Sequence, residues 1–278
     1  MRQISDRRDL PIGVFDSGVG GISVLREAMA VLPGERFLFY GDTANAPYGE
    51  KPADLIRNLT LRATGELIAR GVKALLVACN TATAAGISEL RSRYDIPVLG
   101  MEPALKPAMA NQPGYVVVMA TPATLHLDKF CTLLSRFHDA DRVFPLPCPG
   151  LARLIETGGP GSAVVADALR SFLSSISVVP RAIVLGCTHY SFIAQDIAAL
   201  MPGTAIYDGN RGTALHLRHT LERGGLLCER PALSPRAAFL SSDGSANTQA
   251  LWERFTLMDS PTIPKADPGD FSWGCFSV

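Results

Sequence analysis

The chain has 278 residues, of which 47% are hydrophobic, so it is long enough for one large or two modest globular domains. Its 26 basic and 26 acidic residues cancel, which removes the long-range attraction toward nucleic acid or an anionic membrane, and we expect neither as a partner. No apolar stretch approaches the roughly 20 residues of a membrane span, and the opening residues lack an apolar signal core, so the sequence predicts a cytoplasmic protein.

The cysteines and histidines do not form a recognisable disulfide or metal pattern. Neither CxxC spacing nor close pairing occurs among the six cysteines, which favours reduced thiols. His216 and His219 lie three apart on a predicted helix, but no second pair of ligands follows at zinc-finger spacing. We therefore predict no metal site. The cysteines are Cys79, Cys131, Cys148, Cys187, Cys228 and Cys275.

Short β-rich apolar runs alternate with longer segments of helical period. The segment 51–71 illustrates the helices, because its apolar residues recur at three- and four-residue steps, Pro52 suits a first turn and Gly71 suits an end. Strands this apolar, separated by helices, predict an α/β fold with mainly parallel sheets covered on both faces. The predicted strands are 11–15, 36–40, 73–78, 96–100, 115–119, 181–185 and 204–208.

Two landmarks recur at nearly the same offset along the chain. Asp16 and Thr121 follow similar short strands 105 residues apart, and Cys79 and Cys187 are 108 residues apart. The matching offsets predict two similar α/β units in tandem, with a boundary near 100–107, where two prolines follow a strand. The tail 258–278 has little periodicity and is expected to be poorly ordered or draped on the surface.

Polar residues gather where these strands end, which is where open parallel sheets bind ligands. Cys79 and Cys187 would each lie near a helix N-terminus, whose partial positive charge favours thiolate, so we expect thiol pKa values below the usual value of about 8.5. A buried inert thiol is the alternative for either cysteine alone, but two cysteines at matched turns favour chemistry. The residues expected at this edge are Asp16, Ser17, Cys79, Asn80, Thr81, Thr121, Thr124, Cys187, Thr188 and His189.

The glycine-rich turn "FDSGVGGIS" permits a second interpretation, a dinucleotide site. Its spacing, Gly18, Gly20 and Gly21, departs from G-x-G-x-x-G, and Asp16 would face the region that a pyrophosphate needs. An aspartate there suits an ammonium group or a proton-transfer partner better. Glycines that only allow a tight turn and close helix packing are compatible with either role.

Six stretches resemble glutamate racemases, the cofactor-independent enzymes that make D-glutamate for bacterial peptidoglycan. The combination of "FDSGVGG", "ACNTA" and "GCTHY" carries the resemblance, and the stretches occur in the family's order. The chain departs from the family at Ser191, where proline is common, and at Asn45, where arginine is frequent; neither change removes a proposed catalytic group. The stretches are 12–25, 39–51, 75–84, 96–108, 120–125 and 186–193.

The resemblance implies a fold of two similar α/β domains that face each other across the active site. The first domain would comprise 1–101 plus 213–278, and the second, 102–212, would be inserted into it. It also implies an isomerase that interconverts L- and D-glutamate with two cysteine bases, without a cofactor or metal. Family members are often dimers, so a homodimer is compatible with the resemblance.

The resemblance also assigns roles to individual residues. Cys79 would act on D-glutamate with support from Asp16, and Cys187 on L-glutamate with support from His189. Glu156 matches an acidic catalytic position, although a surface helical glutamate is an equal alternative. The expected ligands of the α-carboxylate are Asn80, Thr81, Thr121, Thr124 and Thr188, and those of the side-chain carboxylate are Ser17 and the backbone of Pro47, Tyr48 and Gly49. Tyr48 has a core or stacking role as its alternative.

Three other functions remain open at this point. A racemase for aspartate or another acidic amino acid could use the same scaffold. A hydrolase could use one thiol as a nucleophile with His189 as its base, but it would leave the second cysteine turn unexplained. The third alternative is a dinucleotide-binding or regulatory module, which the glycine spacing disfavours.

Overall fold

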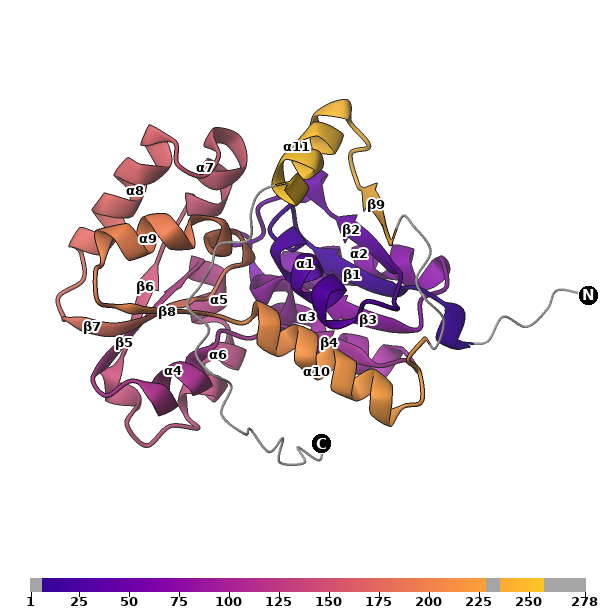
Figure 1. Cartoon of the computed structure of the whole chain (residues 1–278), viewed down its shortest axis with the longest axis horizontal. Helices are drawn as coiled ribbons and strands as arrows, with labels where there is room; N and C mark the ends of the chain where they lie inside the picture. The colour runs from indigo at the N-terminus through magenta and orange to yellow at the C-terminus, as the bar shows by residue number, and fades with distance from the viewer. Residues whose placement is uncertain (1–6, 229–235, 258–278) are drawn as a thin grey trace, which may run out of the picture.

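The computed structural model describes residues 7–228 and 236–257 and arranges their strands in two parallel sheets that lie side by side (Figure 1). The strand order is β4-β3-β1-β2-β9 in the first sheet and β6-β5-β7-β8 in the second. Every pair is parallel, as the apolar strands predicted. The bounds are β1 (Ile12–Asp16), β2 (Phe37–Gly41), β3 (Ala74–Val77), β4 (Val98–Gly100), β5 (Tyr115–Ala120), β6 (Val143–Pro147), β7 (Pro180–Leu185), β8 (Ala205–Asp208) and β9 (Ala237–Ser241).

The two sheets repeat one topology. The order β2-β1-β3-β4 in the first sheet matches β6-β5-β7-β8 in the second. β1 therefore corresponds to β5 and β3 to β7, so Asp16 is equivalent to Thr121 and Cys79 to Cys187. The predicted tandem repeat is confirmed at the level of strand order.

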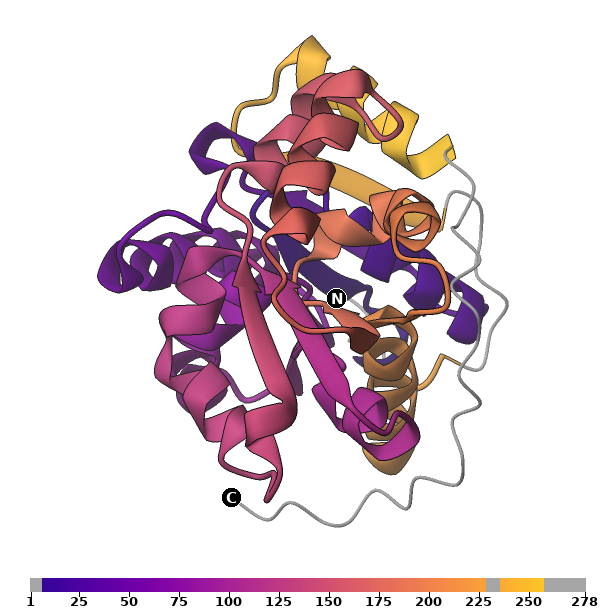
Figure 2. The ribbon, with the colours of Figure 1, turned by 90° about the vertical axis from the view of Figure 1, so that its left-hand side faces the viewer.

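Helices cover both faces of each sheet. We call the first sheet with α1, α2, α3, α10 and α11 the first lobe, and the second sheet with α4 to α9 the second lobe (Figures 1 and 2). In the described ranges no helix is both long enough and apolar enough to cross a membrane. The bounds are α1 (Ile22–Val31), α2 (Ala53–Ala69), α3 (Asn80–Arg93), α4 (Leu105–Asn111), α5 (Pro122–His126), α6 (Asp128–Leu134), α7 (Leu151–Gly158), α8 (Ala163–Ser174), α9 (Ala194–Leu200), α10 (Asn210–Arg223) and α11 (Ala246–Leu257), with 3-10 helices η1 (Arg7–Asp9), η2 (Thr43–Asn45), η3 (Ala140–Arg142) and η4 (Thr188–Ile193).

Successive side chains along each strand point to opposite faces of the sheet, so they pack in two different core layers. Ile12 and Val14 of β1 pack with α1 and α10, whereas Phe15 packs with α2 and α3, since successive strand residues face opposite sides. The layer beneath α1 and α10 continues into the second lobe through Leu185 and Tyr190. A single apolar core layer thus continues from the first lobe into the second.

The chain passes between the lobes twice. It leaves β4 for α4 and returns from β8 into α10, which packs on α1, while β9 extends the first sheet beside β2. These contacts agree with an inserted second unit, and the limits 1–101 plus 213–278 and 102–212 stay predictions. The predicted tail 258–278 lies outside the described residues.

All seven predicted strands are found, and the sequence missed β6 and β9. Both missed strands lie at sheet edges, where one side needs no hydrogen-bonded partner. Pro145 and Pro147 make the sequence of β6 unlike that of a strand. Proline is tolerated in an edge strand because the N–H that it lacks can be one that would face no partner strand. The predicted helix at 51–71 is α2, with Pro52 as its N-cap and Gly71, at φ +76°, just beyond its end.

Candidate active site

A cavity with about 290 Å³ of empty space lies at the carboxyl ends of the strands, between the lobes. The first lobe contributes the residues after β1 and β3 and the loop after η2. The second lobe contributes the residues after β5 and β7 and one residue of α7. Cys79 and Cys187 therefore line one cavity from different lobes. The lining is Ser17, Pro47, Tyr48, Gly49, Cys79, Asn80, Thr81, Thr121, Ala152, Cys187, Thr188 and His189.

Cys79 caps the N-terminus of α3, as the strand-to-helix turn predicted. Its sulfur accepts a hydrogen bond from the Ala82 N–H at 3.4 Å and lies 3.6 Å from Ser17 Oγ. Burial, followed by the negative charge of Asp16, nevertheless raises the pKa of the Cys79 thiol to about 12. The expectation of a lowered pKa at Cys79 is therefore wrong, because desolvation and the nearby carboxylate outweigh the helix N-terminus.

Cys187 has a histidine and a carboxylate as neighbours. Its sulfur lies 3.7 Å from His189 Nδ1, and His189 Nε2 lies 2.7 Å from Glu156 Oε1. The helix that follows, η4, is a short 3-10 helix, and the cysteine side chain makes no capping bond to it. Glu156, His189 and Cys187 therefore form a chain of neighbouring polar groups that ends at the cavity.

The His189–Glu156 pair is held by mutual charge. Burial lowers the pKa of His189, but hydrogen bonds and charge from Cys187 and Glu156 together raise it well above its usual value. Burial would raise the pKa of Glu156, but the hydrogen bond and charge of His189 and the Val19 N–H, 3.2 Å away, hold it below its usual range. With 16% of its side chain exposed, Glu156 is not the surface glutamate of the alternative interpretation.

Asp16 lies behind the cavity wall and links the two lobes. Its carboxylate accepts the Gly18 N–H at 2.8 Å and the Thr188 hydroxyl at 3.2 Å. The side chain is fully buried, and that burial raises its pKa despite the opposing charge of His189. The sequence assigned Asp16 to the Cys79 side; the carboxylate acts electrostatically on Cys79 and hydrogen-bonds the residue next to Cys187.

Asn80, Thr81 and Thr121 line the cavity with hydrogen-bonding groups, and Thr124, which does not line it, supports the two threonines from behind. Thr81 of the first lobe lies 3.0 Å from Thr121 Oγ1 and 2.9 Å from Thr124 Oγ1, both in the second lobe. Asn80 is 3% exposed, and neither atom of its amide has a hydrogen-bond partner among the described residues. A buried unpaired amide costs free energy, which a polar ligand bonded to it would recover.

The loop after η2 forms another wall. Tyr48 is 1% exposed, and its hydroxyl donates to Asp42 Oδ2 at 2.5 Å. Its ring packs near Phe15, with centroids 6.3 Å apart, so Tyr48 has the core role of the alternative interpretation and also lines the cavity. Burial and then the bond to Asp42 raise the pKa of Tyr48, which keeps the phenol neutral. The sequence did not indicate that Asp42, which follows β2, would accept this hydrogen bond and hold the tyrosine in place.

The glycine-rich turn lies against the second lobe. A Cβ at Gly20 would overlap Thr188 Oγ1 and lie 2.5 Å from His189 Nδ1, and one at Gly18 would overlap Glu156 Oε1. The glycines therefore allow Thr188, His189 and Glu156 of the other lobe to approach the backbone of this turn. The same side chains occupy the space that a pyrophosphate would need, which argues against the dinucleotide alternative.

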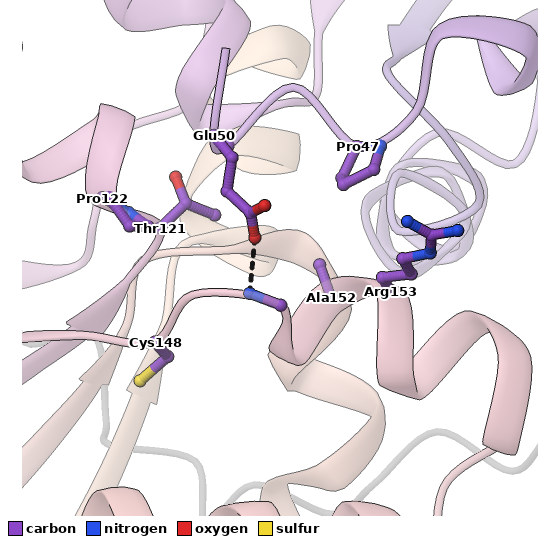
Figure 3. A pocket seen from close by; sticks show the side chains of 9 residues that line it. Pro47, Glu50, Thr121, Pro122, Cys148, Ala152 and Arg153 are labelled. Atoms are coloured by element: carbon purple, nitrogen blue, oxygen red, sulfur yellow. Dashed lines mark hydrogen bonds between the residues drawn. The ribbon is translucent and has the colours of Figure 1, made fainter.

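A second cavity of about 210 Å³ adjoins the first and shares four lining residues with it (Figure 3). The Glu50 carboxylate points across it and accepts the Gly150 N–H at 2.6 Å. Sequence reasoning missed Ala152, although its place four residues before Glu156 on one helix face could have indicated it. It also missed the five residues that line only this second cavity, which are Glu50, Pro122, Cys148, Gly150 and Arg153.

Known proteins share both the sequence and the fold. The family model for Asp/Glu/hydantoin racemases matches residues 24–217. A glutamate racemase from Clostridium botulinum is 46% identical over 238 residues, which are 84% of this chain and 93% of that protein. The solved glutamate racemase from Thermus thermophilus, in complex with β-chloro-D-alanine, is 36% identical with a TM-score of 0.76, covering 89% of this chain and 93% of its own. The Francisella tularensis enzyme in complex with D-glutamate is 27% identical with a TM-score of 0.78, covering 91% and 96%. The chain therefore belongs to the Asp/Glu/hydantoin racemase family.

Proposed function

We propose that this protein interconverts L- and D-glutamate without a cofactor, using Cys79 and Cys187 as two bases. One observation carries the proposal: the two cysteines line one cavity from opposite lobes. Inverting a stereocentre requires removing the α-proton from one face and returning a proton to the other, so bases on opposite walls suit the task. The similarity to glutamate racemases, one of them solved with D-glutamate, supports glutamate as the substrate.

The reaction balances as a pair of proton transfers. With D-glutamate, the Cys79 thiolate takes the α-proton and becomes a thiol, leaving the electron pair on the α-carbon. The Cys187 thiol then donates its proton to the opposite face and becomes a thiolate. With L-glutamate the two cysteines exchange roles. This assignment of enantiomers to cysteines comes from the family resemblance.

The carbanion must be stabilised without the electron sink that pyridoxal phosphate would supply. Hydrogen bonds to the α-carboxylate inside a low-dielectric enclosure serve that purpose. Asn80 is the strongest candidate donor, because its buried amide has no partner among the described residues. Thr81, Thr121, Thr124 and Thr188 complete the proposed α-carboxylate ligands; Ser17 and the backbone of Pro47, Tyr48 and Gly49 are the proposed ligands of the side-chain carboxylate.

Asp16 explains how a thiol with a high pKa can serve as a base. Burial and the charge of Asp16 raise the pKa of Cys79 to about 12. A substrate ammonium group in the cavity would offset the charge of the Asp16 carboxylate across the cavity wall and add positive charge near the sulfur, which favours thiolate. Substrate binding itself would thus activate Cys79. On the other wall, the His189–Glu156 pair can hold a proton 3.7 Å from the Cys187 sulfur.

We infer two further features of the biological role. The product D-glutamate would supply peptidoglycan synthesis, in line with the resemblance. A cytoplasmic location suits the reaction, because both bases must stay reduced and the cytoplasm keeps thiols reduced. Cys79 and Cys187 are both free thiols in the structure.

The direct test incubates the purified protein with L-glutamate in D₂O without added cofactor and follows optical rotation and α-deuterium by NMR. We expect racemisation with solvent deuterium in the product. Cys79→Ala and Cys187→Ala should each lower kcat by at least ~10³-fold, whereas Cys131→Ala, at an exposed thiol of α6, should not change it. Retention of the original α-hydrogen, or near-normal turnover by either active-site variant, would contradict the proposal. Faster turnover of aspartate than glutamate would favour the alternative substrate.

A further inference from the structure

Helix α11 belongs to the first lobe but also contacts the second, at the lobe border seen in Figure 1. Trp252 anchors the helix on the first sheet, with ring centroids 6.1 Å from Phe39 and 5.5 Å from Phe239. Phe255, one turn later, packs on Phe192 of the second lobe at 4.6 Å. Trp252 and Phe255 are buried, so both contacts belong to packed interior and not to a loose surface.

Arg254 of the same helix meets the C-terminus of α7. Its Nη2 donates a hydrogen bond to the backbone carbonyl of Glu156 at 2.6 Å. The last four carbonyls of a helix lack intrahelical partners, and a cation near them is favourable. The last turn of α7 contains no basic residue of its own. Arg254 supplies that cation from 98 residues away in the sequence.

These contacts converge on the two members of one ion pair. The side chain of Glu156 holds His189, and its backbone carbonyl is held by Arg254. Phe192, which Phe255 covers, lies in η4, the same short helix that contains His189. The guanidinium of Arg254 lies 4.9 Å from the Phe255 ring centroid, which joins the two contacts into one unit.

We propose that Arg254 is a positioning residue for the His189–Glu156 pair, and that α11 thereby makes proton transfer at Cys187 depend on a helix of the first lobe. The inference rests on the two-cysteine function proposed above. Loss of Arg254 lets the end of α7 and the Glu156 carboxylate shift relative to His189. Proton transfer at Cys79, whose contacts are with Ser17 and Ala82, keeps its geometry.

The test compares Arg254→Gln and Arg254→Lys with the wild-type protein. Enantiomers have an equilibrium constant of one, so kcat/KM must fall equally for L- and D-glutamate in any variant. We expect Arg254→Gln to lower both by about tenfold or more, as small misplacements of catalytic groups do. Arg254→Lys keeps the cation and should restore most of the activity. Arg170→Gln, at an exposed arginine of α8 that does not line the cavity, is the matched control.

Isotope effects distinguish positioning from a general loss of structure. In the proposed scheme, α-deuterated L-glutamate reports the transfer at Cys187 and α-deuterated D-glutamate the transfer at Cys79. If Arg254→Gln slows the Cys187 step, the deuterium effect on kcat/KM rises for the L-substrate and falls for the D-substrate. A variant that is merely less folded lowers kcat and leaves both isotope effects on kcat/KM at their wild-type values.

Each outcome bears on the inference. Opposite shifts of the two isotope effects, reversed by Arg254→Lys, support it. Unchanged isotope effects in Arg254→Gln, or equal impairment of the lysine variant, overturn it. Wild-type protein that retains the original α-hydrogen overturns the two-cysteine function itself and this inference with it. Thermal unfolding of each variant, followed by circular dichroism, checks that the folded fraction is the same.

Discussion

At the scale of single residues, the two cysteines of the cavity differ in what surrounds them. Cys79 faces a hydroxyl, a backbone N–H and the field of a carboxylate, whereas Cys187 faces an imidazole paired with a glutamate. Equivalent positions in a repeated fold have therefore acquired different partners. Under the proposed function this difference is expected. The two thiols lie on different lobes, so each must be activated by the groups of its own surroundings.

Asp208, at the end of β8, is a buried carboxylate outside the cavity. It accepts hydrogen bonds from Ser191 Oγ at 3.0 Å and from the Asn210 N–H at 3.2 Å. Burial raises its pKa to about 6, although these two bonds oppose the rise, and the charge of Glu27 adds to it. Ser191 thus binds η4 to the strand end where the chain returns to the first lobe.

The raised pKa of Asp208 predicts a pH-dependent stability. The folded state binds this proton more tightly than the unfolded chain does, so the group's stabilising contribution is complete below the ordinary aspartate pKa of 3.8 and is lost as pH rises through about 6. The loss amounts to about 3 kcal/mol at most. Asp208→Asn cannot titrate, so its unfolding free energy relative to wild type should rise between pH 4 and pH 7.

Urea unfolding of both proteins at several pH values measures this difference. Asp167→Asn, the same substitution at an exposed aspartate of α8, is the matched control. A difference between Asp208→Asn and wild type that stays constant from pH 4 to pH 7 would show that the carboxylate does not titrate as its burial implies.

At the scale of elements, the turn between β1 and α1 needs residues without side chains, because side chains of the second lobe lie directly against its backbone. Alanine at Gly20 would push its Cβ into Thr188 and His189. We expect Gly20→Ala to lower kcat/KM by about 100-fold, since the displaced groups lie at the proposed reaction centre. Steady-state kinetics with L-glutamate checks this prediction.

Gly212 of α10 is the control for that substitution, because a Cβ there meets nothing within 4 Å. Gly212→Ala should leave kcat/KM unchanged and stabilise the protein by up to about 1 kcal/mol through helix propensity. Equal kinetics for the two alanine variants would mean that the turn tolerates a side chain and that the lobes do not need this close approach.

The elements that could be predicted were those with a strong local pattern. Seven apolar strands and α2 could be recognised because periodicity and end signals act over a few residues. β6 and β9 could not, because an edge strand needs neither an unbroken apolar run nor every N–H in its ladder. The repeat could be recognised because two pairs of equivalent positions, Asp16 with Thr121 and Cys79 with Cys187, are separated by nearly the same number of residues.

At the scale of the whole molecule, polar contacts hold the lobes together around the cavity. Thr188 bonds Asp16, and Thr81 bonds Thr121. Glu50 extends from the first lobe to the Gly150 N–H at the start of α7 (Figure 3). A carboxylate at a helix N-terminus is favourable, so this contact stabilises the arrangement in which the lobes enclose the cavity.

Removing Glu50 should therefore weaken that arrangement. We expect Glu50→Ala to raise KM for glutamate several-fold, because substrate binding must then supply free energy for holding the lobes together. Amide hydrogen exchange at Gly150 should become faster in the same variant. Glu66→Ala, at a half-exposed glutamate of α2, is the control. Unchanged KM and unchanged exchange in Glu50→Ala would count against a role for this contact.

The sequence by itself determined the α/β class, the tandem units and the polar strand ends, because these depend on neighbours a few residues away. It named Cys79, Cys187 and the residues around them through motifs. Only the tertiary structure decided that Glu156 is buried against His189 and Val19, or that the pKa of Cys79 rises instead of falling. Desolvation and charge depend on side chains that lie far away along the chain, and no local pattern records which of them meet.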